Sequence, residues 1–258
     1  MPVLNRNRLP VAYIFLLSLS VSLPALAADP TASNWTVTLG GGVMISPEYE
    51  GGKEFGPTPL PYLAVTYKDW FSVNSQELSV RVLNQNGFRF ELLGGYELGR
   101  SEDDADHLDG LGDVDFGGKL GGRLSYEFGK MAVFAQLDKS IGGSDGLTGK
   151  MGITYEQMFG NKWILGASAS TTFADNKHMD AYFSVTPRQS ARSGLQRYEA
   201  DAGLKSAQIS ASATYLFNQH WFLRGEAELG ILLLDAADSP IVERNLQPSV
   251  SLLLGYRF

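Results

Sequence analysis

The sequence predicts an all-β protein: a transmembrane, antiparallel, up-and-down β-barrel of about twelve strands, with ten strands as the alternative count. Three observations predict it. Long segments alternate apolar and polar side chains, aromatic residues collect at the ends of these segments, and tight turns alternate with long polar loops. A soluble sandwich also alternates, but these segments run roughly 11 to 15 residues, which is longer than strands of soluble sheets and long enough to cross a bilayer.

The segment 114–128 shows the alternation most clearly. One parity carries apolar side chains such as Phe116, whereas the other carries charged ones such as Lys119 and Arg123. Because successive side chains of a strand point to opposite faces, one face is apolar and the other is charged. The chain end, 252–258, also alternates and finishes on an aromatic residue, which resembles the closing strand of bacterial outer-membrane proteins.

Twelve segments with this pattern follow one another along the chain. They are expected near 34–46, 59–68, 70–75, 77–84, 87–98, 114–128, 131–141, 147–159, 161–174, 203–217, 220–235 and 247–258. The third and fourth are too short to cross a bilayer comfortably, so either they continue through the turn around Gln76 or the count is ten.

Aromatic residues at the segment ends are expected to form the two interfacial girdles of a barrel. They are Trp35, Trp70, Tyr126, Phe128, Phe159, Trp163, Tyr215, Phe217, Trp221, Tyr256 and Phe258.

Long polar connections are expected at 47–58, 99–113, 175–202 and 236–246. Barrels of this kind keep short turns in the periplasm and long loops outside, so both chain ends are expected in the periplasm. The stretch 182–186 is strand-like, but the alternation of short turns and long loops places it inside a long loop, as a lid or a local hairpin.

Residues 1–27 have the pattern of a cleaved secretory signal peptide. Arg6 and Arg8 precede an apolar stretch, and Ala25-Leu26-Ala27 forms an A-x-A cleavage site. Residues 28–258 carry no domain boundary and are predicted to form the barrel. The protein is therefore expected in the outer membrane of a Gram-negative bacterium, in contact with outer-membrane lipid.

The composition excludes several functional classes. The chain has no cysteine and three histidines, which excludes a disulfide scaffold, a thiol nucleophile and a cysteine-ligated zinc site. The net charge of −7 argues against a nucleic-acid partner, because little would neutralise the phosphates. No catalytic residue, cofactor or metal ligand is predicted.

The polar parity is expected to line the lumen with acidic and basic side chains in balance. The candidate lumen network is Arg89, Glu91, Asp115, Lys119, Arg123, Glu127, Arg224, Glu226 and Glu228. A selective channel usually has one dominant sign of charge at its constriction, whereas a balanced set pairs across strands. We therefore expect a narrow or occluded interior, with a small water-filled pore as the alternative.

An enzymatic interpretation rests on His178, which lies between Asp175 and Asp180 and is followed by Ser184. Such residues polarise a water or a serine when they are brought together. The spacing is generic, however, and a solvated loop histidine explains it equally well.

Several motifs, in matching order, resemble the MipA/OmpV family of outer-membrane proteins. They lie at 47–51, 96–100, 182–186, 189–190 and 234–242. The candidate mouth residues within them are Pro47, Tyr49, Gly51, Arg100, Tyr182, Phe183, Gln189, Ser190, Asp235, Asp238, Ser239 and Pro240. One departure is Ser184, where the resemblance leads us to expect a glycine.

The resemblance implies a non-enzymatic scaffold that links a lytic transglycosylase and a penicillin-binding murein synthase at the cell envelope. The alternative is a small-solute channel or a ligand-binding porin. The predicted periplasmic turns are short, whereas a stable interface needs about 800 Å² per partner. Such turns reach this area only jointly. The segments 47–51 and 235–240 are expected to fold over the mouth and form a small ligand site there.

Overall fold

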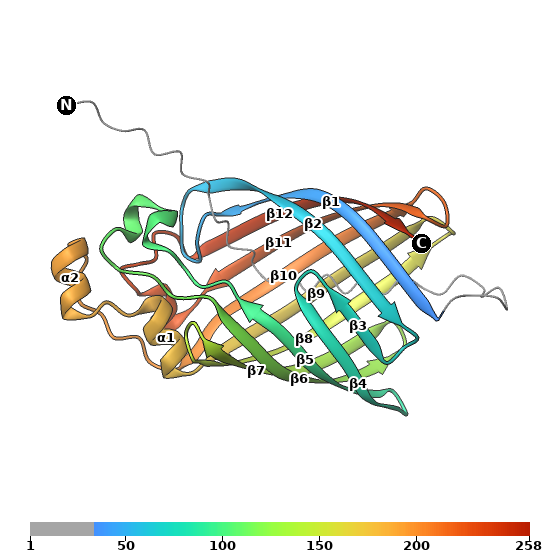
Figure 1. Ribbon diagram of the computed structural model, residues 1–258, viewed down its shortest axis with the longest axis horizontal. Helices are drawn as coiled ribbons and strands as arrows, with labels where there is room; N and C mark the ends of the chain where they lie inside the picture. The colour runs from blue at the N-terminus through green and yellow to red at the C-terminus, as the bar shows by residue number, and fades with distance from the viewer. Residues whose placement is uncertain (1–33) are drawn as a thin grey trace.

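The computed structural model describes residues 34–258, which form one closed antiparallel barrel of twelve strands (Figure 1). The strands are β1 (Trp35–Pro47), β2 (Phe55–Tyr67), β3 (Phe71–Asn74), β4 (Glu77–Gln85), β5 (Phe88–Glu97), β6 (Gly117–Phe128), β7 (Met131–Gly142), β8 (Leu147–Phe159), β9 (Trp163–Ala174), β10 (Gly203–Leu216), β11 (Trp221–Leu232) and β12 (Leu246–Arg257). Each strand pairs with its neighbours in sequence, and β1 pairs with β12 to close the barrel. The prediction of twelve strands is confirmed, and the alternative of ten is wrong. The predicted signal peptide, 1–27, lies outside the described residues.

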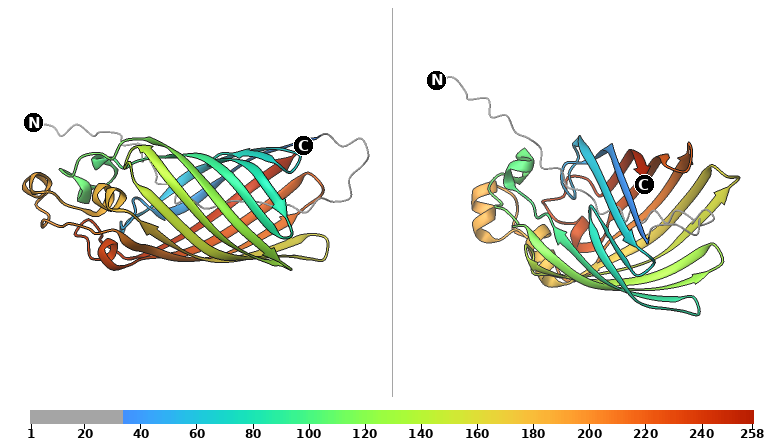
Figure 2. Two further views of the ribbon diagram at one scale, coloured as in Figure 1. Left: turned by 90° about the horizontal axis from the view of Figure 1, so that it is seen from below. Right: turned by 45° about the vertical axis from the view of Figure 1, so that its right-hand side comes forward.

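The helices all lie at one end of the barrel, which we name the loop end (Figures 1 and 2). They are the 3₁₀ helices η1 (Glu102–Asp104) and η2 (Asp106–Leu108) and the α-helices α1 (Asn176–Phe183), α2 (Pro187–Ser193) and α3 (Leu234–Ala237). The opposite end, named the turn end, carries the tight turns together with Trp35 and Phe258. No helix within residues 34–258 has the length and apolar character needed to cross a bilayer.

The strand-like stretch 182–186 is extended in part: Tyr182 and Phe183 end α1, whereas Val185 forms an isolated antiparallel bridge with Tyr198 before α2 begins. Capping side chains start the helices on both sides of this bridge. The Asp175 carboxylate accepts a hydrogen bond from the His178 N–H (3.0 Å) at the start of α1. Thr186 and Gln189 then form a capping box at the start of α2, whose first residue is a proline.

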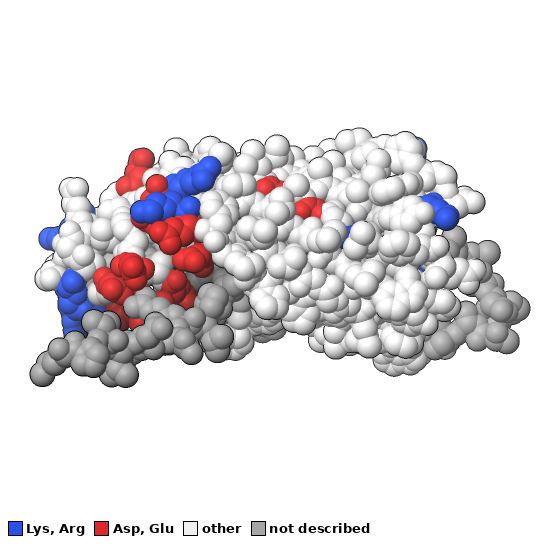
Figure 3. Space-filling view, turned by 90° about the horizontal axis from the view of Figure 1, so that it is seen from above, with Lys and Arg blue, Asp and Glu red and all other residues white. Residues whose placement is uncertain are grey.

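The outward face of the strands is apolar. Leu120, Leu137 and Ile209 are 60%, 54% and 58% exposed, and they share the outward parity of their strands. On the face seen in Figure 3, the middle of the barrel is almost free of charge, while acidic side chains gather at the loop end. An uncharged band of this kind matches the hydrocarbon core of a membrane.

The aromatic residues predicted to form two girdles lie on a single rim, at the turn end. Odd-numbered strands begin there and even-numbered strands finish there, so both kinds of strand terminus meet at this end. Neighbouring rings are in contact, with centroids 4.5 Å apart for Trp35 and Tyr67 and 4.8 Å apart for Trp163 and Tyr215. The prediction that these residues are divided between two girdles is therefore wrong.

The part of β2 nearer the loop end is unpaired on the side that faces β3, because β3 has only four residues. Within residues 34–258, β3 pairs with β2 over 64–67, and no strand pairs with that side of β2 above it. The Leu63 N–H faces this side and donates to Ser75 Oγ (2.9 Å). Alternate residues direct their backbone groups to the same side of a strand. The next three positions facing the edge are occupied by Pro61, Pro59 and Pro57. Proline removes their N–H groups, so the edge lacks the donors that would template another strand.

An apolar cluster, which we name the floor, occupies part of the lumen. Its members project inward from β1, β2 and β9 to β12, and they are Met44, Leu60, Ile164, Leu216, Phe222 and Leu253. All six are at most 8% exposed. Polar residues were expected at the inward positions, so the floor is a departure from the expected alternation.

Packing in the floor predicts that Gly255→Ala destabilises the barrel. A Cβ at Gly255 would overlap the ring of Phe222, which is 1% exposed and has little room to move. We expect a loss of about 1–3 kcal/mol in urea unfolding, typical of overpacking, and recovery in the double variant with Phe222→Leu. Gly41→Ala is the matched control, because a Cβ there meets no atom within 4 Å. Equal destabilisation by both alanine variants would contradict this account.

Candidate functional site

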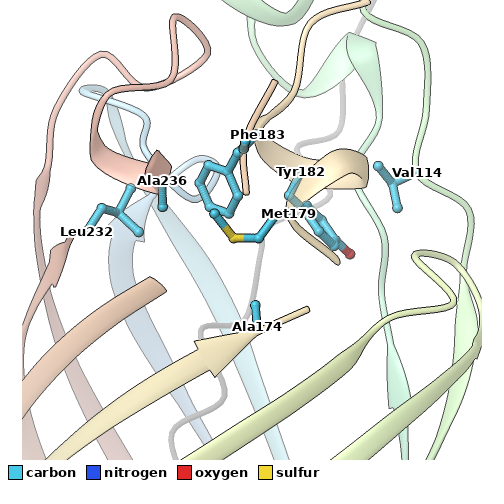
Figure 4. Close-up of a cluster of buried hydrophobic side chains, with 8 residues drawn as sticks. Val114, Ala174, Met179, Tyr182, Phe183, Leu232 and Ala236 are labelled. Carbon is cyan, nitrogen blue, oxygen red and sulfur yellow. The ribbon is translucent and has the colours of Figure 1, made fainter. Parts of the chain in front are cut away.

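The loop end is closed by a cap formed by α1, α3 and the loops packed on them. Met179 and Phe183 of α1 are 1% and 0% exposed, and Ala236 of α3 is fully buried. Figure 4 shows Met179 and Phe183 between Ala236 and Tyr182, above Ala174 of β9. The cap is therefore anchored by apolar packing onto the ends of the barrel strands.

Three hydrogen bonds fasten the cap to loops distant in sequence. Ser239 Oγ donates to the Phe183 carbonyl (2.6 Å), and Arg100 Nη1 donates to the Tyr182 carbonyl (2.9 Å). Gln189 Nε2 donates to the carbonyl of Leu111 (2.6 Å). These bonds tie the long loops after β5, β9 and β11 into one unit.

A second buried cluster supports the cap from the β1–β2 loop. It contains Tyr49, Leu108, Leu111, Val185 and Ile241. The Tyr49 hydroxyl donates to the Ile241 carbonyl (3.1 Å) and to Glu243 Oε2 (3.2 Å). Burial, followed by the nearby Glu243 carboxylate, raises the pKa of Tyr49, so the phenol remains a neutral donor.

The remaining predicted mouth residues lie in or beside this cap. Gly51, in the left-handed region at φ 99°, accepts N–H groups of the β11–β12 loop through its carbonyl. The Asp235 carbonyl accepts from the Tyr198 hydroxyl (2.9 Å), and the Pro240 carbonyl lies 3.0 Å from His107 Nε2. Pro47, Ser190 and Asp238 belong to the same end of the barrel. The structure thus brings together motifs that are up to 193 positions apart in the chain (Pro47 to Pro240, 240 − 47).

Beneath α1 lies a buried ionic cluster of Glu50, Glu97, His178 and Lys205. Lys205 Nζ is 2.8 Å from Glu50 Oε1 and 3.5 Å from His178 Nε2. His178 Nδ1 lies 3.7 Å from Glu97 Oε1 and is buried without a hydrogen-bond partner among the described residues. Glu97 is satisfied instead by Ser144, whose N–H and hydroxyl both donate to it at 3.0 Å.

The pKa of His178 is lowered well below its ordinary value. Burial is the main cause, and the positive charges of Lys205 and Lys119 add to it. These effects outweigh the attraction of Glu97, so His178 is neutral in the closed cap at neutral pH.

The structure does not assemble the catalytic triad considered from the sequence. Ser184 Oγ donates to Asp180 Oδ1 (3.0 Å) and accepts the Ala200 N–H (2.9 Å). His178 faces Glu97 and Lys205 instead. Ser184 also has φ −84° at the end of α1, a conformation that does not require the expected glycine.

Charged side chains pair in the lumen on the β4 to β7 side. Arg123 Nη2 lies 2.9 Å from Glu77 Oε2, and Arg123 Nε donates to Gln136 Oε1 (2.8 Å). Gln136 in turn donates to Asp138 Oδ2 (2.7 Å). Glu91 lies 3.9 Å from Arg123 Nη1 and completes the group.

A second group occupies the β10 to β11 side. Arg224 Nη2 lies 2.9 Å from Glu226 Oε2, and Arg224 Nη1 donates to Thr214 Oγ1 (3.3 Å). Gln208 Nε2 donates to Glu228 Oε1 (2.8 Å). Each group has one arginine among two or three carboxylates, and the arginine is satisfied by carboxylates and by an amide or a hydroxyl.

Other predicted lumen residues are placed differently. Arg89 and Glu127 pair with each other at the turn end, with 2.6 Å between Arg89 Nη2 and Glu127 Oε1. Asp115 precedes β6 and is exposed, so it is not a strand residue. Glu77 was not among the predicted lumen residues, although it shares the inward parity of Arg81 on β4.

The turn end carries a basic rim, which we define as Lys68, Lys130 and Lys162 in three different turns. All three lysines are exposed. Lys68 Nζ lies 5.6 Å from the Tyr67 ring centroid, and Lys162 Nζ lies 5.8 Å from that of Tyr215. Cation–π contacts of this kind hold the ammonium groups against the aromatic rim.

A closed barrel with an uncharged outer band and an aromatic rim defines an outer-membrane β-barrel protein. The family model described as MltA-interacting protein MipA matches residues 39–258, so the chain belongs to the MipA family. It is 28% identical over 103 residues to "Putative outer membrane protein YiaT" of Escherichia coli K12, and equally to the protein of that name in Escherichia coli O157:H7. This match covers 40% of the chain and 41% of each relative, so it spans about two fifths of the relatives' length.

Solved barrels are also similar. The KdgM porin matches 86% of this chain and 99% of its own length at a TM-score of 0.40 and 9% identity. The NanC porin matches 86% and 98% at 0.41 and 7% identity. A "Bacterial polysaccharide outer membrane secretin" matches 87% and 98% at 0.46 and 8% identity. At these identities the similarity concerns the fold alone.

The buried neutral His178 predicts that the cap loosens in acid. Its pKa in the closed cap is below the value of about 6.5 for an exposed histidine, so the opened cap binds the proton more tightly. Stability of the closed cap is therefore full above about pH 6.5 and falls as pH drops below it, by at most about 1.4 kcal/mol per pH unit.

Hydrogen exchange of the α1 amides, corrected for intrinsic rates, measures this opening at pH 7.5 and pH 5.0. The His178→Gln variant is the control and is expected to show a much weaker pH response. An unchanged protection of α1 at pH 5.0 in the unaltered protein would contradict the prediction.

Proposed function

We propose that this protein is a non-enzymatic outer-membrane scaffold whose basic rim binds a lytic transglycosylase and a murein synthase in the periplasm. The observation that supports the proposal is that a packed cap lies at one end, while paired charges and the apolar floor project into the lumen. We infer from it that the barrel is filled. A barrel filled in this way acts through its two ends. The printed description of the family, an MltA-interacting protein, supports the choice of partner.

In this proposal residues 1–27 direct export and are removed, and the turn end faces the periplasm, as is the rule for such barrels. No single turn there is large enough for a stable interface of about 800 Å² per partner. The partner therefore contacts several turns at once, and Lys68, Lys130 and Lys162 offer it a ring of positive charge. A partner with an acidic docking surface is the complement.

Charge reversal on the basic rim tests the scaffold. We expect the double variant Lys130→Glu and Lys162→Glu to weaken capture of both murein enzymes at least about tenfold, because attraction becomes repulsion at two turns. Capture by the immobilised, refolded barrel measures this. The control is Asp103→Lys with Asp109→Lys, which reverses two exposed acids at the loop end. Undiminished capture by the rim variant would contradict the scaffold proposal.

A small-solute channel is the second candidate, and the polar side chains lining the lumen favour it. Single-channel recording in a planar bilayer separates the two candidates. We expect a correctly folded barrel to be silent at neutral pH, because Arg123 and Arg224 are held in the lumen by their carboxylate partners. Steady, discrete openings that change when Arg123→Ala is introduced would establish a water-filled path and favour the channel.

A further inference from the structure

A cavity of about 470 Å³ opens at the turn end, between the β2–β3 turn and the lower part of β4. It is lined by Lys68, Asp69, Trp70, Arg81, Val82, Leu83 and Asn84. The volume lies within the range of about 300–1,000 Å³ found for small-molecule sites. Nothing in the scaffold proposal uses this cavity.

The cavity exists because two neighbouring strands are offset. The Arg81 N–H donates to the Trp70 carbonyl (2.6 Å). From this bond towards the turn end, β4 continues to Gln85, whereas β3 does not extend beyond Phe71. A bulge between Arg81 and Leu83 then alters the side-chain direction along β4. In Figure 1 the β4–β5 hairpin reaches beyond the β2–β3 turn at the lower right.

One wall of the cavity is apolar and membrane-facing, whereas Arg81 and Asn84 lie opposite Glu91 and Arg89 on the inward face of β4 and β5. Trp70, Val82 and Leu83 are 49%, 59% and 45% exposed. Trp70 is part of the aromatic rim, with its ring centroid 6.0 Å from that of Tyr67. Aromatic rims lie at the level of the lipid headgroups, so the cavity opens where headgroups and acyl chains meet.

The charged groups of the cavity are two cations and one carboxylate. Lys68 is exposed, and its backbone sits in the left-handed region at φ 48°, which is uncommon for a lysine. Arg81 Nε lies 3.9 Å from Glu91 Oε1, and within residues 34–258 this buried nitrogen has no hydrogen-bond partner. Asp69, between the two in sequence order, is exposed and adds one negative charge.

We propose that this cavity binds one zwitterionic phospholipid of the periplasmic leaflet. Lys68 at the turn and Arg81, which lines the cavity from the inward face of β4, hold the phosphate oxygens through charge-assisted hydrogen bonds. Asp69 accepts from the ammonium of an ethanolamine headgroup. The acyl chains run along Val82 and Leu83 into the apolar band. Two cations and one carboxylate match a headgroup with an anionic and a cationic centre better than they match a simple anion.

Native mass spectrometry of the delipidated, refolded barrel tests this assignment by titration with phosphatidylethanolamine. We expect one lipid to be retained preferentially, and Lys68→Gln and Arg81→Gln each to weaken its retention at least about fivefold. Lys162→Gln is the matched control, because Lys162 also lies over a tyrosine ring but lines no part of this cavity. Heat-dependent mobility on gels confirms that each variant is folded.

Two further titrations distinguish the ligand class. Phosphatidylglycerol lacks the ammonium, so we expect it to bind more weakly than phosphatidylethanolamine, and Asp69→Asn to remove this difference. Inorganic phosphate is expected not to displace the lipid. Equal retention by Lys68→Gln and Lys162→Gln would overturn the site, and displacement by inorganic phosphate would overturn its assignment to a lipid.

Discussion

Closure of the backbone hydrogen bonds is the constraint on which the rest of this protein depends. Lipid offers no partner to a peptide group, so a sheet that crosses a membrane closes on itself and leaves few backbone donors unpaired. Here the ladder between β1 and β12 runs from Thr38 opposite Arg257 to Ile45 opposite Val250 and joins the ends of the chain. Once this pairing is made, every strand has two neighbours and the alternation of side chains separates lipid from lumen.

Closure also determines what the inward side chains must do. The inward side chains of twelve strands share one enclosed space, where an unpaired charge is costly. Arg123 and Arg224 therefore meet carboxylates on their own or neighbouring strands. At the loop end the same requirement appears beneath α1, where Lys205 is held by Glu50. His178 avoids an unpaired buried charge by remaining neutral.

The sequence was informative wherever a short-range rule applies, and less so where the outcome depends on distant segments. Period-two alternation predicted the strands, including the two short ones, because side-chain direction is a local property. The helices α1 and α2 were missed, since the strand-like residues 182–186 obscured the caps at Asp175 and Thr186. The floor was also missed: Phe222 and Leu253 are inward yet apolar because they pack in one cluster with residues of strands distant in sequence, such as Leu60 of β2. The alternation along the chain carries no information about packing between distant strands.

The four-residue strand β3 links the two places where the barrel departs from regularity. Towards the loop end, β3 stops at Asn74 and leaves the earlier part of β2 unpaired on that side. The unpaired edge carries Pro57, Pro59 and Pro61 in place of backbone donors. Towards the turn end, the side of β4 that faces β3 has no partner strand beyond Val80, and the cavity lined by Lys68 and Arg81 lies there. A longer β3 would pair both stretches and remove both features together. Barrel closure does not require β3 to be short, so the short strand is where this wall has room for a ligand.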